Sequence, residues 1–322
     1  MAEPDLSTDL GFLTLKNPVI AASGTFGYGL ELLPFCPPEA LGAVIPKGVS
    51  LAPWAGNPGP RACEASGGLI NAIGLENMGI ERFLTEALPP LKARGATVGV
   101  NVLGSEPEDY PRLAERIAGS GADFIELNIS CPNLKKGGLS FGQDPNVAGS
   151  VIRESVAAAK GIPVVAKLPP LVSDMANLAS ISEKSGASAI SLVNSVPALA
   201  VDLATKGPKL ANVTGGLSGP PIKPLALRQV YVASGAVSIP VIGMGGIFTA
   251  EDALEFLLAG ASAVQVGTAT LADPRAPLRI IQGIGDYLRK TGESLRDILS
   301  QRLPKANSGL CSGPPPATKG TK

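Results

Sequence analysis

The chain has 322 residues, and its 27 basic side chains balance its 27 acidic ones, so its formal net charge is zero. A neutral chain has no basic surface to attract nucleic acid or an anionic membrane. No uninterrupted apolar stretch reaches the ~18 residues of a membrane-spanning helix, and the N-terminus lacks the basic and apolar regions of a secretory signal. We therefore expect a soluble cytoplasmic protein.

Histidine is absent from the sequence, which excludes Ser-His and Cys-His nucleophile pairs and imidazole metal sites. The four cysteines are Cys36, Cys63, Cys131 and Cys311, and no two are spaced as Cys-x-x-Cys. This spacing argues against a structural zinc or an iron–sulfur cluster, so we expect no metal site in this chain. Acid–base chemistry must therefore fall to Cys, Lys, Asp, Glu or Tyr.

Eight short apolar runs alternate with helical segments along the chain. The predicted strands are 18–22, 43–47, 97–101, 122–127, 163–167, 187–193, 240–244 and 262–266. The predicted helices are 81–91, 107–118, 146–160, 174–184, 223–234, 249–258, 277–291 and 294–301. This alternation predicts an α/β fold, and the number of strands favours a closed (β/α)8 TIM barrel with long active-site loop insertions over an open doubly wound sheet.

Two segments rich in Pro and Gly, 52–68 and 197–221, are predicted to be long irregular loops. The tail from Pro304 onward is rich in Gly, Pro, Ser, Thr and Lys, a composition typical of disorder. We therefore expect one barrel domain over residues 1–303 and a disordered tail over 304–322, in which Cys311 has no role.

Polar residues and glycines occur where the predicted strands end. In a parallel barrel these ends meet on the face that carries the active site. A hydrophobic barrel has no structural need for lysines and amides at that face, so we interpret the set as a functional site. The residues are Ser23, Lys47, Asn101, Asn128, Lys167, Asn194, Gly245-Gly246 and Gly267-Thr268.

The glycine turns after the seventh and eighth strands, Gly243-Met-Gly-Gly246 and Gly267-Thr268, lie where such barrels bind phosphate. Glycines allow backbone N–H groups to approach an anion, and a helix N-terminus adds a favourable dipole. Lys47 and Lys167 could neutralise a phosphate, a carboxylate or the edge of a flavin ring. The alternatives are ordinary turn glycines and solvated lysines.

The segment from Asn128 to Gly138 places a thiol, Cys131, directly after a buried strand. Pro132 stiffens the turn after the thiol, and Gly137-Gly138 loosen the chain beyond it. A rigid thiol beside a mobile loop suits gated proton transfer, although most free cysteines are small buried hydrophobes.

Several asparagines supply the paired donors and acceptors that suit a flat ring bearing amide groups. Each could instead be a turn residue, so the prediction depends on the whole set. A phosphate-bearing cofactor, a planar amide substrate and a thiol base together indicate redox chemistry on a heterocycle. The asparagines are Asn71, Asn101, Asn128, Asn133 and Asn194.

Seven motifs between about Leu10 and Arg302 resemble, in the same order, those of dihydroorotate dehydrogenases. The motif with the thiol is Asn128-Ile-Ser-Cys-Pro-Asn133. The others are Ala22-Ser-Gly-Thr-Phe-Gly27, Asn71-Ala-Ile-Gly-Leu75, Gly99-Val-Asn101, Gly215-Gly-Leu-Ser-Gly219, Ile242-Gly-Met-Gly-Gly246 and Val264-Gln-Val-Gly-Thr268.

Two further features place the resemblance within that family. A cysteine at 131 in place of serine is similar to the soluble class 1 enzymes. Lys135-Lys-Gly-Gly138 with Phe141-Gly-Gln-Asp-Pro145 resembles class 1B, the NAD-linked type.

The resemblance implies oxidation of (S)-dihydroorotate to orotate in pyrimidine (UMP) biosynthesis. Cys131 would remove a proton from C5 as C6 delivers hydride to N5 of FMN. Electrons would pass to NAD through a partner subunit that carries FAD and a [2Fe–2S] cluster, in a heterotetramer with a homodimeric core. An ordinary thiol with a pKa of about 8.5 is a poor base at neutral pH, so turnover should rise with pH unless nearby lysines lower that pKa.

The resemblance also implies two residue sets besides the catalytic Cys131. The cofactor set is Ser23, Lys47, Gly48, Asn101, Asn128, Lys167, Val193, Gly219, Gly245, Gly246, Gly267 and Thr268. The substrate set is Lys47, Asn71, Ala72, Ile73, Gly74, Leu75, Asn128, Asn133, Asn194 and Ser195.

One segment departs from the family pattern. After Lys167 the family usually has Leu, then Ser or Thr, Pro and Asn, whereas this chain reads Leu168-Pro-Pro-Leu171. A hydroxyl and an amide that could position Lys167 are therefore missing.

Four other functions fit parts of the pattern. The pyrimidine-reducing domain of dihydropyrimidine dehydrogenases shares the barrel and the thiol, although Asn133 and Lys47 favour a substrate with a carboxylate. A class 1A-like homodimer would use another electron acceptor. A phosphate-sugar isomerase would have the barrel without redox chemistry, and an FMN-binding scaffold would have lost turnover.

Overall fold

Eight parallel strands form the closed barrel that the sequence predicts. The computed structural model describes residues 3–130 and 141–304 of the chain. The strands pair in the order β4-β3-β16-β15-β10-β9-β8-β7, and a parallel bridge between Val44 and Val98 joins the two ends of this order. The barrel strands are β3 (Val19–Ala21), β4 (Ala43–Val44), β7 (Gly99–Val102), β8 (Phe124–Asn128), β9 (Val164–Lys167), β10 (Ala189–Leu192), β15 (Val241–Met244) and β16 (Ala263–Val266).

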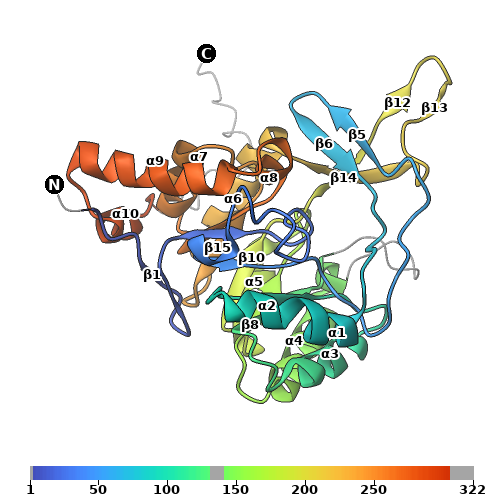
Figure 1. The fold of residues 1–322 in the computed structure, drawn as a ribbon, viewed down its shortest axis with the longest axis horizontal. Coiled ribbons are helices and arrows are strands. Elements are labelled where there is room, and N and C mark those ends of the chain that lie inside the picture. Colours follow the sequence, from blue (N-terminus) through green and yellow to red (C-terminus); the bar gives the residue numbers. More distant parts are fainter. Residues whose placement is uncertain (1–2, 131–140, 305–322) are drawn as a thin grey trace, which may run out of the picture.

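Helices surround the barrel (Figure 1). All the predicted helices are present, but the one expected at 81–91 is divided by a π-helical turn at Phe83–Ala87, and the short α8 was not predicted. The helices are α1 (Ile80–Arg82), α2 (Leu88–Ala93), α3 (Asp109–Ile117), α4 (Pro145–Ala158), α5 (Met175–Lys184), α6 (Lys223–Ser234), α7 (Ala250–Leu258), α8 (Thr268–Ala272), α9 (Ala276–Thr291) and α10 (Leu295–Ser300). Short 3-10 turns lie at Pro38–Ala40, Phe141–Gln143 and Pro220–Ile222.

The apolar faces of the helices pack on the outside of the barrel. Leu113 of α3, Ile152 of α4 and Phe256 of α7 belong to one buried cluster with the strand residues Ile125 and Leu127. Burial of this layer supplies most of the hydrophobic stabilisation of such a fold.

A two-stranded hairpin closes the end of the barrel at which the strands begin, which we call the lower end. Its strands are β1 (Thr8–Asp9) and β2 (Thr14–Leu15), which pair antiparallel. Leu10 and Leu15 are fully buried against interior residues of the barrel that include Phe124. The hairpin therefore shields the apolar lower interior from water.

The barrel interior changes from apolar to polar along its axis. Successive residues of a strand point to opposite sides, so Phe124 and Glu126 of β8 both point inward, as do Val165 and Lys167 of β9. Phe124 and Val165 lie in the apolar lower cluster, whereas Glu126 and Lys167 are buried polar residues nearer the carboxyl ends. The fold thus assembles a polar layer beneath the face on which barrel active sites lie.

Parts of the two segments expected to be irregular loops, with residues that flank them, form a second, antiparallel sheet, so the prediction was wrong for those parts. This sheet has the order β11-β14-β6-β5 and stands beside the barrel in Figure 1. Its strands pair across large sequence separations and β14 contains two glycines, which is why local patterns did not reveal it. The strands are β5 (Ala62–Ala65), β6 (Gly68–Asn71), β11 (Val196–Leu199) and β14 (Thr214–Ser218).

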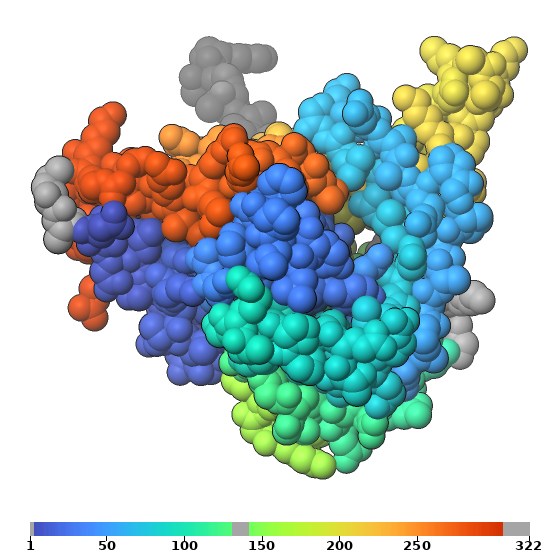
Figure 2. Space-filling model, viewed as in Figure 1, coloured from blue at the N-terminus to red at the C-terminus, as the bar shows by residue number. Residues whose placement is uncertain are grey.

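A small hairpin projects from the second sheet. Its strands are β12 (Val201–Asp202) and β13 (Gly207–Pro208), and it stands clear of the rest of the molecule in Figure 2. Leu203 at its turn is 87% exposed. The hairpin therefore contributes little to the core.

Across residues 3–130 and 141–304, no helix has the length and apolar character needed to cross a membrane. Within the same residues, no group of three or more metal-ligating side chains is close enough to hold an ion. The predicted tail beyond Pro304 and Cys311 lie outside the described residues.

Candidate functional site

A cavity of about 780 Å³ opens at the carboxyl ends of the barrel strands. The second sheet forms one of its walls, through residues such as Leu69 of β6 and Ser218 of β14. All twelve residues of the cofactor set line this cavity. Residues that are spread from position 23 to position 268 therefore converge on one site, as the strand-end pattern predicts.

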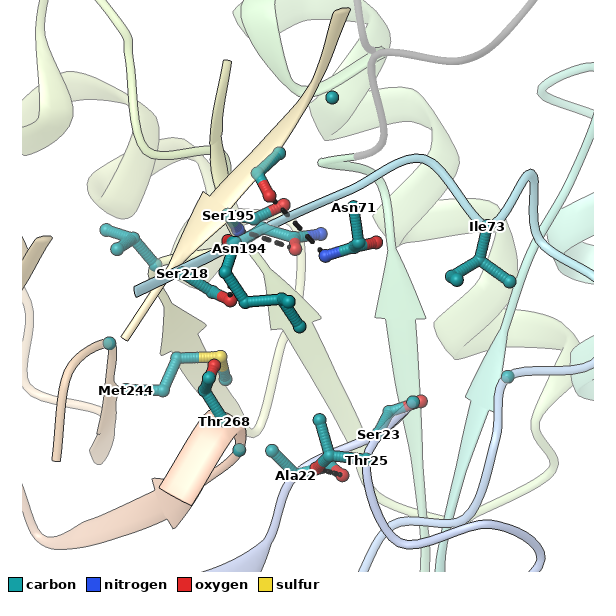
Figure 3. Close-up of a pocket in the computed structure, with 18 of the residues that line it drawn as sticks. Ala22, Ser23, Thr25, Asn71, Ile73, Asn194, Ser195, Ser218, Met244 and Thr268 are labelled. Carbon is teal, nitrogen blue, oxygen red and sulfur yellow. Dashed lines mark hydrogen bonds between the residues drawn. The ribbon is translucent and has the colours of Figure 1, made fainter. Parts of the chain in front are cut away.

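Most of the substrate set lines the same cavity. Asn71, Asn194 and Ser195 lie together on one side of it, and Ala22, Ser23 and Thr25 lie on the opposite side (Figure 3). The set also includes Lys47, Ile73, Gly74, Leu75 and Asn128, which line the cavity.

Ala72 is the one described member of the predicted substrate set that does not line the cavity. Its side chain is buried with Ile70 and Leu210 in a small apolar cluster of the second sheet, and it does not line the cavity. Asn71, the last residue of β6, points its side chain into the cavity, whereas the side chain of Ala72, just beyond the strand, packs into the sheet. Cys131 and Asn133 lie outside the described residues.

The chain leading to Cys131 is fixed by a group of hydrogen bonds. The Asn194 amide donates to Ser130 Oγ at 2.8 Å and to Asn128 Oδ1 at 3.3 Å. Ser130 Oγ donates to the same Asn128 oxygen at 2.8 Å, and the buried Tyr110 hydroxyl donates to the Asn128 carbonyl at 2.8 Å. The last described residues before the thiol are therefore anchored at the cavity wall.

A buried carboxylate that sequence reasoning missed lies beneath the cavity floor, in contact with three residues that line it. Glu126 has no exposed surface. Its Oε1 accepts from Asn101 Nδ2 at 2.7 Å and Lys167 Nζ at 3.4 Å. Its Oε2 accepts from Ser191 Oγ at 2.8 Å and Gln265 Nε2 at 2.6 Å. We call these five side chains the floor network; they come from five different strands.

The floor network explains how Lys167 is positioned despite the altered segment that follows it. Lys167 is 4% exposed, and its ammonium group pairs with Glu126 from the neighbouring strand. The backbone beyond it is also held, since Leu168 N donates to the Ser191 carbonyl and the Gln229 amide donates to the Pro170 carbonyl. Lys167 therefore does not depend on a hydroxyl in the next loop.

Glycine is required at several points of the cavity wall. Gly245 and Gly246 have φ values of +121° and +78°, which L side chains rarely adopt. A Cβ on Gly48 would lie 2.3 Å from Asn101 Oδ1. The backbone can therefore approach a ligand closely at these positions.

The N-terminus of α7, which follows the first glycine turn, is capped by its own side chains. Thr249 Oγ1 accepts from Asp252 N, and Asp252 Oδ2 accepts from the backbone N–H groups of Phe248 and Thr249. These three N–H groups are already used, so they are not available to a phosphate here.

Two charged residues at the cavity were not predicted. Arg61 and Glu76 form an ion pair with an N–O distance of 2.6 Å, and both line the cavity. The hydrogen bond from Arg61 lowers the pKa of Glu76, and the charge of Lys47 lowers it further. Lys47 and Arg61 thus provide two cationic groups close to one end of the cavity.

The family model and the relatives that resemble this chain carry the same description. Residues 5–288 match the family model described as dihydroorotate dehydrogenase. The dihydroorotate dehydrogenase B (NAD(+)) catalytic subunit of Geotalea daltonii is 50% identical over 300 residues, which cover 91% of this chain and 96% of the relative. The protein of the same description from Geobacter sulfurreducens is 50% identical over 293 residues, covering 91% and 96%.

A solved structure resembles the whole fold. The crystal structure of DHODH from Eimeria tenella, in complex with ferulenol, superposes with a TM-score of 0.77 at 23% sequence identity. The match covers 94% of this chain and 90% of that one, so the two proteins have the same fold.

Proposed function

The chain belongs to the dihydroorotate dehydrogenase family, and from this membership we propose that its cavity binds FMN beside (S)-dihydroorotate and oxidises the substrate to orotate. The observation that carries the proposal is the convergence of the whole cofactor set, with Asn71, Asn194 and Gln265, on one cavity. Family membership also removes the phosphate-sugar isomerase from consideration. The product, orotate, would enter pyrimidine biosynthesis.

The residues present suit FMN. A cavity of about 780 Å³ is of the size that cofactors and similar ligands occupy, ~300–1,000 Å³. Lys167 can donate to a ring carbonyl, and Gln265 Oε1, which has no partner among the described residues, can accept from a ring N–H. The glycine turns at 245–246 and 267 would bring backbone N–H groups to the phosphate. When bound, FMN supplies the acceptor for the hydride.

The substrate is proposed to lie among the amides on the wall beside the second sheet. Asn71 offers a donor and an acceptor to the flat ring of dihydroorotate, and Asn194, whose NH₂ group is held by Asn128 and Ser130, offers its amide oxygen (Figure 3). Lys47 would neutralise its carboxylate, with Arg61 close to the same end of the cavity. A ring held between polar walls in this way has a fixed orientation, which lowers the entropic part of the barrier.

Cys131 is proposed as the general base. Dihydroorotate loses a proton from C5 to the thiolate and a hydride from C6, and the C5–C6 single bond becomes the double bond of orotate. Ser130 is anchored beside Asn128 and Asn194 at the cavity wall, which supports placing the next residue near the substrate. Proton removal by a positioned side chain contributes ~10²–10⁴-fold to such reactions.

The partners are proposed from the relatives. Proteins about half identical to this chain are described as the catalytic subunit of an enzyme that uses NAD(+). We therefore expect a cytoplasmic complex in which a homodimeric core of this barrel is joined to an electron-transfer subunit that carries FAD and a [2Fe–2S] cluster. A homodimer that uses another acceptor is the alternative.

The visible spectrum of the purified chain tests the proposal. The protein should be yellow, and its flavin absorption should bleach when dihydroorotate is added without oxygen. Dihydrouracil is the matched control, because it lacks the carboxylate and should bleach the flavin far more slowly. A colourless protein would contradict the cofactor assignment, and faster bleaching by dihydrouracil would favour a dihydropyrimidine dehydrogenase-like function.

Replacement of the thiol tests the catalytic residue. We expect Cys131→Ser to slow flavin reduction by about 10²-fold or more, because a serine hydroxyl is a much weaker base at neutral pH. Rapid mixing with dihydroorotate measures this rate, and FMN content should be unchanged. If the variant is reduced as fast as the parent protein, Cys131 is not the base. A scaffold without turnover would show no bleaching in either protein.

A further inference from the structure

The floor network has an unusual arrangement of donors. Four groups donate to the two oxygens of Glu126, one of them the ammonium group of Lys167. Burial of a carboxylate is costly unless its oxygens are paired. A carboxylate that accepts four hydrogen bonds meets that condition, since it accepts and does not donate.

This arrangement fixes which way two amides point. Because a carboxylate only accepts, Asn101 and Gln265 must turn their NH₂ groups toward Glu126, whichever way an amide might otherwise be assigned. Their oxygens then point elsewhere. Asn101 Oδ1 lies 3.5 Å from the amide nitrogen of Asn128.

The oxygen of Gln265 has no such partner. Gln265 is 1% exposed and lines the cavity, and its Oε1 accepts no hydrogen bond from any described residue. An unpaired buried acceptor costs free energy. A ligand in the cavity that carries an N–H group would remove this cost.

We propose that Glu126 is a positioning residue that sets the hydrogen-bonding pattern of the cavity floor. It holds the Lys167 ammonium as a donor and turns Gln265 so that Oε1 is an acceptor. A donor and an acceptor side by side match the imide edge of a flavin ring, which alternates carbonyl groups with one N–H. The inference rests on the proposed function, since that function places FMN in the cavity.

The consequence of replacing Glu126 by Gln follows from the charges around it. The new NH₂ group would be repelled by Lys167, so it would face Ser191 and Gln265. Gln265 would then turn its oxygen toward that NH₂ group and present its own NH₂ group to the cavity. The floor would offer a donor where the flavin N–H needs an acceptor.

Two flavins separate this effect from a general loss of structure. Apo-protein is titrated with FMN and with 3-methyl-FMN, which lacks the ring N–H, and quenching of flavin fluorescence gives both dissociation constants. The ratio of the two constants measures how strongly the N–H is recognised. The bulk of the methyl group enters the ratio of every variant alike, so a change in the ratio reports the hydrogen bond.

We expect the ratio to fall by about 10-fold in Glu126→Gln, because the buried acceptor is lost. Ser191→Ala is the matched control: it removes another hydrogen bond to the same carboxylate, but Ser191 does not line the cavity, so the ratio should stay within about 2-fold. The exchange variant Glu126→Gln with Gln265→Glu should recover the ratio, since the carboxylate moved to position 265 would accept from both the amide placed at position 126 and the flavin.

The outcomes are distinct. If both dissociation constants rise by the same factor in Glu126→Gln, the ratio is unchanged and Glu126 has only a structural role. If Glu126→Gln does not fold, the exchange variant decides, because it keeps one carboxylate in the network. A ratio of the two dissociation constants that is far lower in the exchange variant than in the parent protein overturns the inference. A parent protein that binds both flavins equally overturns the inference and leaves the proposed function standing, whereas one that binds neither overturns both.

Discussion

At the scale of single residues, position along a strand decides whether a side chain serves the core or the cavity. Phe124 and Glu126 are two residues apart on β8 and both point into the barrel, yet one belongs to the apolar lower cluster and the other to the floor network. A buried ion pair such as Lys167–Glu126 is no better for stability than apolar residues of the same size. Its presence in the barrel therefore supports the proposed ligand site rather than a role in stability.

A charged residue outside the cavity has a structural role that depends on pH. Burial raises the pKa of Asp252, but the hydrogen bonds from Lys223, Phe248 and Thr249 outweigh it and leave the pKa below its ordinary value of 3.8. Its Oδ1 lies 2.5 Å from Lys223 Nζ, which ties the start of α6 to α7. A lowered pKa means that folding favours the carboxylate. Its contribution is therefore complete above pH 3.8 and is lost as the pH falls through the lower folded-state value.

Asp252→Asn should lower the free energy of unfolding by about 1 kcal/mol at neutral pH, because it loses a charge-assisted hydrogen bond. Urea unfolding at pH values from about 7 to about 3 measures the difference from the parent, which should shrink in acid as Asp252 is protonated. Asp297→Asn removes the same kind of cap at α10 without an ion pair among the described residues, so the larger loss expected in Asp252→Asn reports the contact with Lys223. A difference that stays constant with pH would contradict this account.

Site residues differed in how well the sequence could predict them. Lys167 and Asn194 could be predicted because each follows an apolar strand, and Asn71 because it belongs to a motif of the family. Glu126 was missed because it lies inside an apolar run and its partners come from four other strands, so no local pattern marks it. Gln265 was missed for the same reason, although it lies within the family motif Val264-Gln-Val-Gly-Thr268.

At the scale of elements, the second sheet completes the site. Strand β14 passes between β6 and β11, so it brings the residues around Asn71 and Ser195 onto one wall. Its glycines are needed for this close approach. A Cβ on Gly216 would lie 2.0 Å from Ser195 Oγ and 2.7 Å from Ser195 Cβ.

Gly216→Ala should therefore displace Ser195 and weaken substrate binding. We expect the KM for dihydroorotate to rise about 10-fold, since a misplaced side chain in a tight site costs ~1–3 kcal/mol, while the dissociation constant of FMN stays unchanged. Steady-state kinetics and flavin titration measure the two effects. Gly207→Ala in the β12–β13 hairpin is the control, because a Cβ there meets nothing closer than 3.7 Å. An unchanged KM in Gly216→Ala would show that Ser195 does not hold the substrate.

At the scale of the whole molecule, the fold combines a barrel with two insertions that meet in space. The barrel could be predicted because each strand and helix has a local period, and the predicted strands are confirmed within a few residues. The insertions could not, because β6 pairs with β14 across about 145 residues, as in the contact from Asn71 to Gly216. The same long-range pairing explains why the sequence did not show that the Ala72 side chain is buried in the sheet.

The two ends of the barrel should respond differently to mutation, because the lower end is apolar and the upper end carries the cavity. Leu10 is fully buried in the lower cluster, so Leu10→Ala should lower the free energy of unfolding by about 2–5 kcal/mol, the usual cost of such a cavity. Denaturant unfolding measures this loss. The dissociation constant of FMN at a temperature where the variant is folded should not change, since Leu10 does not line the cavity.

Leu203→Ala is the control, because that side chain is 87% exposed and should alter neither quantity. Should Leu10→Ala weaken FMN binding while stability is unchanged, the lower end would be coupled to the site, and the division of the barrel into a stabilising end and a functional end would be wrong.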